Sequence, residues 1–127
     1  MTDDPIAAAL RQGGIIDITT NGRTSGQPRR IEIVFFHVDG HVYITGTPGT
    51  RAWLANLKAD PSMTFHLKRG PTADLPAKAR VVTDESERRA VATAACTAWN
   101  RPDQIEDFVA GSPVIEVRFD DRSLLST

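Results

Sequence analysis

The sequence predicts a mainly β fold of the α+β kind, in which about six antiparallel strands form a closed or partly closed barrel with short helices inserted. Its 127 residues fit a single domain, expected to span 1–127. Asp39-Gly40 separates two apolar segments and is typical of a two-residue hairpin turn, because both central positions need a positive φ. The segment 63–68 alternates apolar and polar residues, which indicates a strand with one buried face. Because open sheets expose their edges, we expect closure or pairing with a second chain.

The elements follow from the spacing of apolar and turn residues. Strands are expected over 15–20, 30–38, 41–46, 63–68, 77–83 and 114–119. Helices are expected over 6–12 and 51–58, from a cap at Asp84 through Ala98, and over 104–110, where Gly111 would occupy the C′ position. The run Ile31 to Phe36 is apolar on both faces except at Glu32. Such a strand is covered on both sides, either within one chain or across a two-fold axis, and we expect a homodimer.

Composition excludes several classes of protein. A net charge of −1 gives no global field that would attract a nucleic acid. The only cysteine, Cys96, cannot form an internal disulfide, which favours the cytoplasm, and among alanines on a helix it is expected to be a small core residue. No apolar run approaches the roughly 20 residues of a membrane span, and the first residues do not resemble a signal peptide.

Two loops have the residues of an anion site. Between Thr19 and Arg30 the chain gathers three arginines, four hydroxyl side chains and two glycines. Arginine binds phosphate or carboxylate with two hydrogen bonds, and glycine lets the backbone approach a ligand. The segment Thr45 to Arg51 leads into a helix, whose first N–H groups also attract anions. A solvated hairpin loop and ordinary helix capping explain the same two patterns, so the residues alone leave both interpretations open.

The helix expected after this second loop has an apolar side. Trp53, Leu54 and Leu57 share that side, and Trp53 is expected to close one end of the barrel. Asn56 lies in the middle of the helix, where its propensity is below average. A hydrogen bond from its side chain to the neighbouring loop would explain its place there.

A metal site and a serine nucleophile are not expected. With Asp39-Gly40 as the turn, His37 and His41 point to opposite faces of the hairpin, and His66 belongs to another strand. No cysteine or acidic residue completes a set of metal ligands. The Gly-x-Ser-x-Gly motif of serine hydrolases is absent from the sequence.

Two ordered segments resemble a known family. Ile18-Thr-Thr-Asn-Gly-Arg-Thr-Ser-Gly-Gln-Pro-Arg29 is similar to the hairpin motif TTTGRxSGxPR of deazaflavin-dependent nitroreductase-like proteins. Trp53-Leu-Ala-Asn-Leu-Lys-Ala-Asp-Pro61 is similar to the WxxNLxAnP segment of the same family. The match in order and spacing runs through residues 15–68, about half of the chain. The wider superfamily includes flavin-binding split barrels of the pyridoxamine-phosphate oxidase type.

The resemblance implies a split antiparallel β-barrel that binds coenzyme F-420, a deazaflavin that carries hydride. It implies that the anionic tail of the cofactor is held by Arg23, Ser25 and Arg29. It further implies that the deazaflavin and its linker are lined by Thr45, Gly46, Thr47, Pro48, Gly49, Arg51, Trp53 and Asn56. Family members often carry tyrosines late in the chain near the substrate, whereas Tyr43 is the only tyrosine here, which argues against specific nitroreduction.

The resulting hypothesis is an F-420-dependent oxidoreductase that transfers hydride to a small unsaturated or electron-poor substrate. The protein would supply orientation and electrostatics to a reaction whose chemistry belongs to the cofactor. His66, Trp99 and Asn100 are candidates for the substrate side, and no proton donor is assigned. One alternative is an FMN-binding oxidase or reductase on the same barrel. The other is a non-catalytic carrier of a cofactor, a fatty acid or haem.

Overall fold

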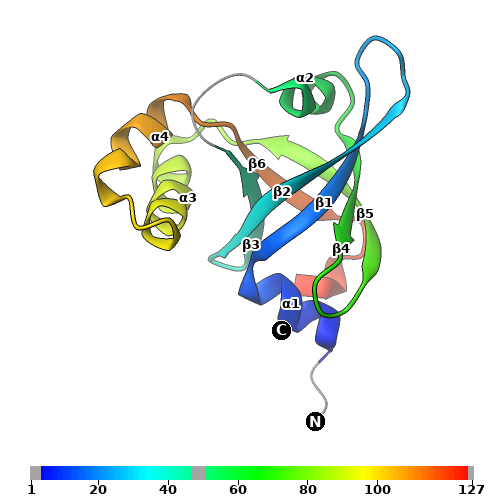
Figure 1. The fold of residues 1–127 in the computed structure, drawn as a ribbon, viewed down its shortest axis with the longest axis horizontal. Helices are drawn as coiled ribbons and strands as arrows, with labels where there is room; N and C mark the ends of the chain where they lie inside the picture. The colour runs from blue at the N-terminus through cyan, green and yellow to red at the C-terminus, as the bar shows by residue number, and fades with distance from the viewer. Residues whose placement is uncertain (1–3, 47–50, 126–127) are drawn as a thin grey trace.

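The computed structural model describes residues 4–46 and 51–125 (Figure 1). Within these residues, six strands form a closed antiparallel barrel in the order β1-β2-β3-β6-β5-β4, which confirms the predicted fold class. The strands are β1 (Gly14–Asn21), β2 (Pro28–Val38), β3 (His41–Thr45), β4 (Ser62–Leu67), β5 (Ala73–Val81) and β6 (Val114–Phe119). The helices are α1 (Pro5–Gln12), α2 (Ala52–Ala59), α3 (Glu85–Ala98) and α4 (Ile105–Gly111), with 3-10 turns η1 (Pro102–Gln104) and η2 (Arg122–Leu125).

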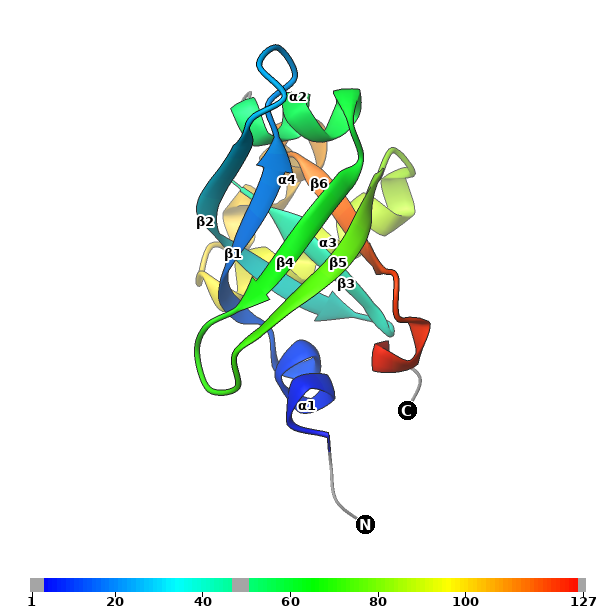
Figure 2. The same ribbon diagram turned by 90° about the vertical axis from the view of Figure 1, so that its right-hand side faces the viewer.

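The interior of the barrel is filled by alternate apolar residues of the strands. Phe65 lies at its centre and contacts Phe35 and Phe119 edge to face, at ring-centroid distances of 5.1 and 5.2 Å. Figures 1 and 2 show α2 over one end of the barrel and α1 with η2 at the other. Trp53 and Leu57 of α2 belong to the same core, as Leu10 of α1 does, so Trp53 closes the end as expected.

A second apolar cluster joins α3 and α4 to the outer face of the barrel. Tyr43 of β3 packs there with Val91 and Phe108, and Phe36 of β2 meets Trp99 at a centroid distance of 5.9 Å. The inward residues of β2, among them Ile33 and Phe35, belong to the barrel core. Both faces of this part of β2 are therefore covered largely within one chain, which is one of the two outcomes that the sequence left open.

Several local predictions are confirmed. Asp39 and Gly40 have φ values of 52° and 82°, and β2 pairs with β3 in the register His37 to Val42. The carboxylate of Asp84 caps α3 by accepting a hydrogen bond from the backbone N–H of Glu87 at 2.9 Å. Cys96 is buried in the second cluster, where burial raises the pKa of its thiol.

Most element boundaries lie within two residues of the expected ones, and two of the differences have a clear physical reason. Strand β5 begins at Ala73 instead of residue 77, although Pro76 lies inside it. Proline is tolerated at this point because β6 pairs with β5 only from Ala77 onward. Gly111 is the last residue of α4 and not its C′ residue, because the helix ends at Ser112, whose backbone N–H donates to the carbonyl of Phe108 at 2.9 Å.

None of the described helices is long and apolar enough to cross a membrane.

Candidate functional site

The side chain of Asn56 in α2 is hydrogen-bonded to the hairpin between β1 and β2. Its Oδ1 atom accepts a hydrogen bond from the backbone N–H of Arg23 at 3.1 Å, and its Nδ2 atom donates to the hydroxyl of Thr20 at 3.2 Å. Asn56 is only 6% exposed, so these bonds satisfy an amide that water hardly reaches. The hydrogen bond to the loop that the mid-helix position predicted is therefore confirmed.

A second pair of side chains binds the hairpin to the C-terminal end of α2. Asn21 donates from Nδ2 to Oδ2 of Asp60 at 3.0 Å, while Oδ1 of Asp60 accepts from the backbone N–H of Ser62 at 3.0 Å. The hydrogen bond from Asn21 is the largest of the effects that lower the pKa of the Asp60 carboxyl. With one contact from the middle of α2 and one from its C-cap, the hairpin and α2 form one unit.

The loop of the hairpin is tight and depends on two glycines. Gly26 has a φ of +69°, a conformation that side chains rarely adopt, and its N–H donates to the carbonyl of Gly22 at 2.8 Å. A Cβ atom on Gly22 would lie 2.7 Å from the hydroxyl oxygen of Ser25. That oxygen accepts from the backbone N–H of Gln27 at 3.1 Å, so the hydroxyl hydrogen of Ser25 remains available to an acceptor.

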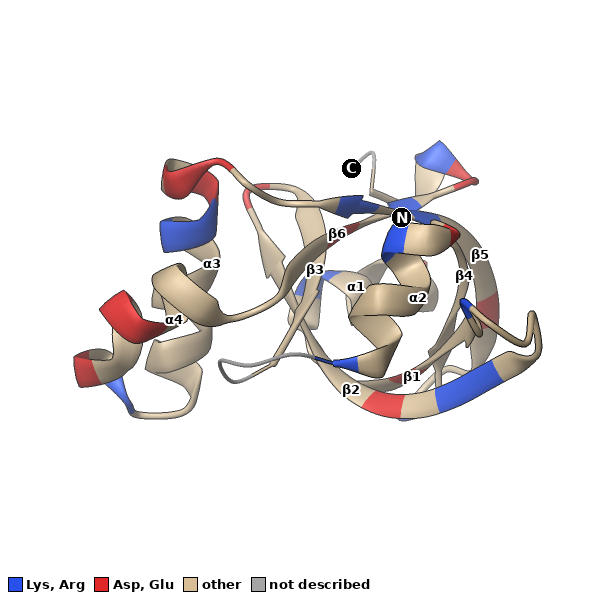
Figure 3. Ribbon diagram, turned by 90° about the horizontal axis from the view of Figure 1, so that it is seen from above, with Lys and Arg blue, Asp and Glu red and all other residues tan. Residues whose placement is uncertain are grey.

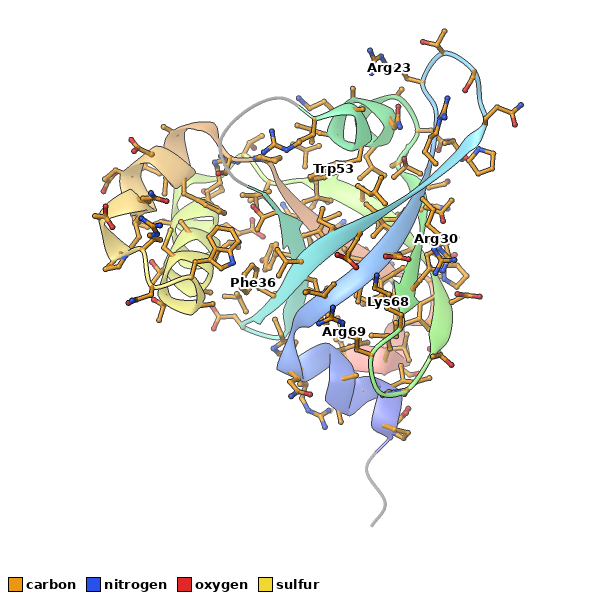
Figure 4. The ribbon with its side chains drawn as sticks, in the orientation of Figure 1. Arg23, Arg30, Phe36, Trp53, Lys68 and Arg69 are labelled. Atoms are coloured by element: carbon orange, nitrogen blue, oxygen red, sulfur yellow. The ribbon has the colours of Figure 1, made fainter. Side chains whose placement is uncertain are left out.

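Two exposed arginines of the hairpin carry charges that nearby carboxylates do not neutralise. Among the described residues, neither Arg23 nor Arg29 has a salt-bridge partner, whereas the next residue, Arg30, pairs with Asp17 at 2.9 Å. Arg29 lies opposite Thr20 in the β1–β2 ladder, and Arg30 points to the other face because successive strand residues alternate. Figure 4 shows Arg23 projecting from the loop on the side of α2. The positive charge at this end of the barrel therefore favours the binding of an anion.

The second anion-prone loop is described only at its ends. Arg51 directly precedes α2, and its guanidinium lies near Gly46, where an added Cβ would be 3.7 Å from Nε. Figure 3 shows this basic position and those of the hairpin around the end of the barrel that α2 covers. The hydroxyl of Thr45 is buried and donates to the carbonyl of Pro113 at 2.5 Å, so only its backbone could face a ligand. Thr47, Pro48 and Gly49 lie outside the described residues.

The three candidates for the substrate side do not share one place. His66 lies between Thr19 and Asp74, with its Nε2 atom 2.7 Å from the Thr19 hydroxyl and its Nδ1 atom 2.6 Å from the Asp74 carboxylate. Its side chain is only 9% exposed, and both ring nitrogens are occupied. Trp99, by contrast, packs on Phe36 beside α3, far along β2 from the arginine hairpin (Figure 4).

Asn100 has a structural explanation of its own. Its φ of 57° places it in the left-handed region directly after α3. The N–H of Asn100 donates to the carbonyl of Thr97 at 3.1 Å, and that of Arg101 donates to the carbonyl of Cys96 at 2.7 Å. These two bonds form the Schellman motif that ends many helices, and asparagine is a common residue at its left-handed position.

A charged network on the outer face of the barrel was not predicted from the sequence. Lys68, which directly follows β4, donates to Asp17 of β1 at 2.7 Å and also pairs with Glu32 of β2. The hydrogen bond from Lys68, followed by that from Arg30, lowers the pKa of the Asp17 carboxyl. Alternation along a strand shows which face a residue is on. It does not show which strands are neighbours, and the order of strands is what brings these residues together. Across 4–46 and 51–125, no cluster of histidine, cysteine and carboxylate side chains could hold a metal ion.

Comparisons with known proteins agree with this arrangement. A profile of the F420H(2)-dependent quinone reductase family matches residues 2–104. A candidate pyridoxamine 5′-phosphate oxidase of Listeria innocua is 15% identical with a TM-score of 0.71, and the match covers 91% of each chain. An F420-H2-dependent reductase is 19% identical with a TM-score of 0.59, over 83% of this chain and 94% of that one. A domain-swapped dimer is 20% identical with a TM-score of 0.63, over 83% and 80%.

At these identities, the solved structures show that the fold is shared. No curated protein sequence matches the chain significantly. The family match covers both the arginine hairpin and α2, the two segments whose motifs resemble deazaflavin-dependent proteins. The chain therefore belongs to the F420H(2)-dependent quinone reductase family, and it is an F-420-dependent reductase built on a split β-barrel.

Proposed function

We propose that the protein transfers hydride from reduced F-420 to a small electron-poor acceptor, for which the family name indicates a quinone. The cofactor supplies the hydride when it is bound. One observation supports the location of the site: the arginine hairpin is locked to α2 through Asn56, with Arg23 and Arg29 exposed and without a carboxylate partner among the described residues. Asn56 holds the backbone of the loop that carries Arg23 before a ligand arrives, which lowers the entropy lost on binding.

The hairpin is proposed to hold the anionic tail of the cofactor. Arg23 and Arg29 would bind its phosphate or carboxylate groups with charge-assisted hydrogen bonds. Ser25 would donate its free hydroxyl hydrogen, because its oxygen already accepts from the backbone. These residues suit a group that is anionic and extended, since all three lie on an exposed loop and strand end.

The deazaflavin end is proposed to lie at the start of α2, where Arg51 approaches Gly46. Arg51, the backbone of Thr45 and Gly46, and the segment 47–49 would line it. Trp53 is mostly buried in the barrel core and would offer one edge. Asn56 would act as a positioning residue, because both ends of its buried side chain bind the hairpin.

On the substrate side, Trp99 is the candidate that the structure favours. It is half-buried against Phe36 and Phe108, and an aromatic surface of this kind suits a planar acceptor. His66 and Asn100 are better explained by the hydrogen bonds that they make within the fold. We therefore propose Trp99 as a substrate contact, with the other two residues as structural neighbours.

The test is an acceptor-dependent oxidation assay. The purified protein, loaded with reduced F-420, is mixed with a panel of short-chain quinones and nitroaromatic compounds, and cofactor oxidation is followed by absorbance. We expect turnover with quinones, with a raised KM for Trp99→Ala and no turnover when reduced FMN replaces F-420. Tight F-420 binding without turnover on any acceptor would contradict the proposal and leave a carrier.

A homodimer in the cytoplasm is the proposed state of the protein. The buried, free Cys96 is compatible with a reducing compartment. Coverage of Phe36 by Trp99 means that β2 does not itself require a partner chain, so dimerisation would have to use another surface. Sedimentation equilibrium tests this point, and a monomer at every concentration would contradict it.

A further inference from the structure

Three hydrogen-bonded side chains cross three strands on the outer face of the barrel. Thr19 of β1, His66 of β4 and Asp74 of β5 point outward, because the residues next to them along each strand belong to the barrel core. Nε2 of His66 lies 2.7 Å from Oγ1 of Thr19, and Nδ1 lies 2.6 Å from Oδ1 of Asp74. A hydroxyl, an imidazole and a carboxylate in this order form the arrangement that activates a nucleophile.

The direction of the two hydrogen bonds follows from the charge of Asp74. The hydrogen bond from His66 is the largest of the effects that lower the pKa of the Asp74 carboxyl, so Asp74 is ionised at neutral pH. A carboxylate only accepts, and the His66 ring therefore carries a hydrogen on Nδ1. In the neutral ring the lone pair is then on Nε2, which accepts the hydrogen of the Thr19 hydroxyl. His66 is thus placed to take the proton of Thr19 as a general base.

Thr19 is open to solvent on this outer wall. It is half-buried, and the residue opposite it on β4 is the small, half-buried Thr64. The next residue in the same row is Pro76 of β5, which is exposed. The His66 side chain beside Thr19 is only 9% exposed, so its ring is held in one orientation by the sheet and by its two hydrogen bonds.

The same face places a cation beside the Thr19 hydroxyl. Arg30 lies directly opposite Thr19 in the β1–β2 ladder, and its Nε donates to Asp17 at 2.9 Å. Its terminal nitrogens have no partner among the described contacts. The charge of Arg30 also helps to lower the pKa of Asp74, three strands away from β2, so the side chain extends across β1 toward β4 (Figure 4). A guanidinium in this position can stabilise negative charge on a carbonyl oxygen that Thr19 attacks.

We propose that Thr19, His66 and Arg30 form a second catalytic site, which hydrolyses small carboxylic esters that have an acidic leaving group. The substrate is small because Thr19 lies on a sheet surface. Its leaving group is acidic because one guanidinium stabilises the oxyanion. This site is separate from hydride transfer, since Arg29, which is proposed for the cofactor, points to the opposite face of β2.

The reaction needs only the ester and water. Oγ1 of Thr19 bonds to the carbonyl carbon while its proton passes to Nε2 of His66, and Arg30 stabilises the oxyanion. The bond to the leaving oxygen then breaks, and that oxygen takes the proton from His66. Water attacks the acyl-threonine with His66 again as the base, and the proton taken from water returns to Oγ1 of Thr19 as the carboxylic acid leaves.

The test follows the release of nitrophenolate from 4-nitrophenyl acetate by the full-length protein without F-420. Thr19→Val keeps the shape of the side chain and removes the nucleophile, so we expect kcat/KM to fall about hundredfold. Thr19→Ser keeps the hydroxyl and should keep the activity. Thr64→Val is the matched control, because it removes a hydroxyl from the position directly opposite on β4 and should leave kcat/KM unchanged.

Two further variants separate the roles of the charged residues. Asp74→Asn, at an exposed position, should lower kcat and leave KM unchanged, because Asp74 orients His66 without touching the ester. Arg30→Ala should lower kcat/KM about tenfold and leave the Kd of F-420 unchanged. Arg29→Ala should do the reverse, so a failure of the esterase proposal is distinguishable from a failure of the cofactor site.

Mass spectrometry of the unmodified protein tests the covalent step without any variant. The reaction with 4-nitrophenyl acetate is stopped with acid, and the peptides are mapped for an acetyl group, which we expect on Thr19. Acetyl groups on lysine side chains alone would overturn the proposal. Equal kcat/KM for the unmodified protein and Thr19→Val, or an equal loss in Thr64→Val, would also overturn it.

Discussion

At the scale of single residues, Asn56 carries the connection between the hairpin and α2. Asn56→Ala would leave the backbone N–H of Arg23 and the hydroxyl of Thr20 without their partner in a buried place. We expect a loss of about 1–3 kcal/mol in the free energy of unfolding, measured by urea denaturation. Asn21→Ala removes one half-buried bond and should cost less. Equal losses in the free energy of unfolding of the two variants would contradict the view that Asn56 makes the main contact between the hairpin and α2.

Glu116 determines a pH dependence of stability. Burial raises the pKa of its carboxyl, but hydrogen bonds from Arg80, Arg118 and His41 outweigh burial and lower the pKa overall. A lowered folded-state pKa means stabilisation that is complete above the ordinary value of 4.5 and is lost as the pH falls through the lower folded value.

Glu116→Gln should therefore cost about 3 kcal/mol near neutral pH, because Arg80 and Arg118 lose their buried partner. The difference from the unmodified protein should shrink in acid, as urea denaturation at a series of pH values would show. Glu85→Gln is the control, since Glu85 pairs with Arg89 on an exposed helix face. A loss of stability that is the same at every pH would contradict a role for the Glu116 charge.

At the scale of elements, the end of α3 separates a structural role from a functional one. Asn100 has a φ of 57°, so Asn100→Ala should lower the free energy of unfolding by about 1 kcal/mol, whereas Asn100→Gly should not. Thermal unfolding measures both. A glycine variant that is stable but has a raised KM for the acceptor would show that the amide contacts substrate, contrary to the capping role.

The sequence predicted elements best where local chemistry decides them. Asp39-Gly40 and Asp84 each fix a turn or a cap through their own backbone or carboxylate, and both are confirmed. The start of β5 was missed because Pro76 argues against a strand when its neighbours are unknown. A left-handed capping residue was expected at Gly111 after α4. The chain has such a residue at Asn100, after the longer helix α3.

At the scale of the whole molecule, the barrel has two different ends. The pairing of β1 with β4 closes it, and this contact joins segments more than forty residues apart in the register Thr19 to Thr64. Spacing within a strand cannot reveal such a partner, so the Thr19, His66 and Asp74 hydrogen bonds could not be foreseen. The same holds for the union of His41, Arg80 and Glu116, which come from three strands.

The candidate cofactor site was predicted more completely, because its motifs are continuous in sequence. The hairpin 18–29 and the segment 53–61 were identified from residues that lie next to each other, and the structure brings the two together through Asn56. The motifs could not show which of the adjacent arginines is bound to a carboxylate within the fold. Arg30 turned out to be paired with Asp17, and this leaves Arg29 for a ligand.

This division provides the most direct test of the account, a titration of F-420 against the unmodified protein, Arg29→Ala and Arg30→Ala. The two variants remove the same charge from adjacent positions of β2, and they differ in the face to which the side chain points and in the salt bridge that Arg30 makes with Asp17. The account predicts that Arg29→Ala raises the Kd of F-420 about tenfold, with Arg30→Ala close to the unmodified protein. Equal weakening by both variants, or weakening by Arg30→Ala alone, would contradict the placement of the cofactor tail at the end of the barrel that α2 covers.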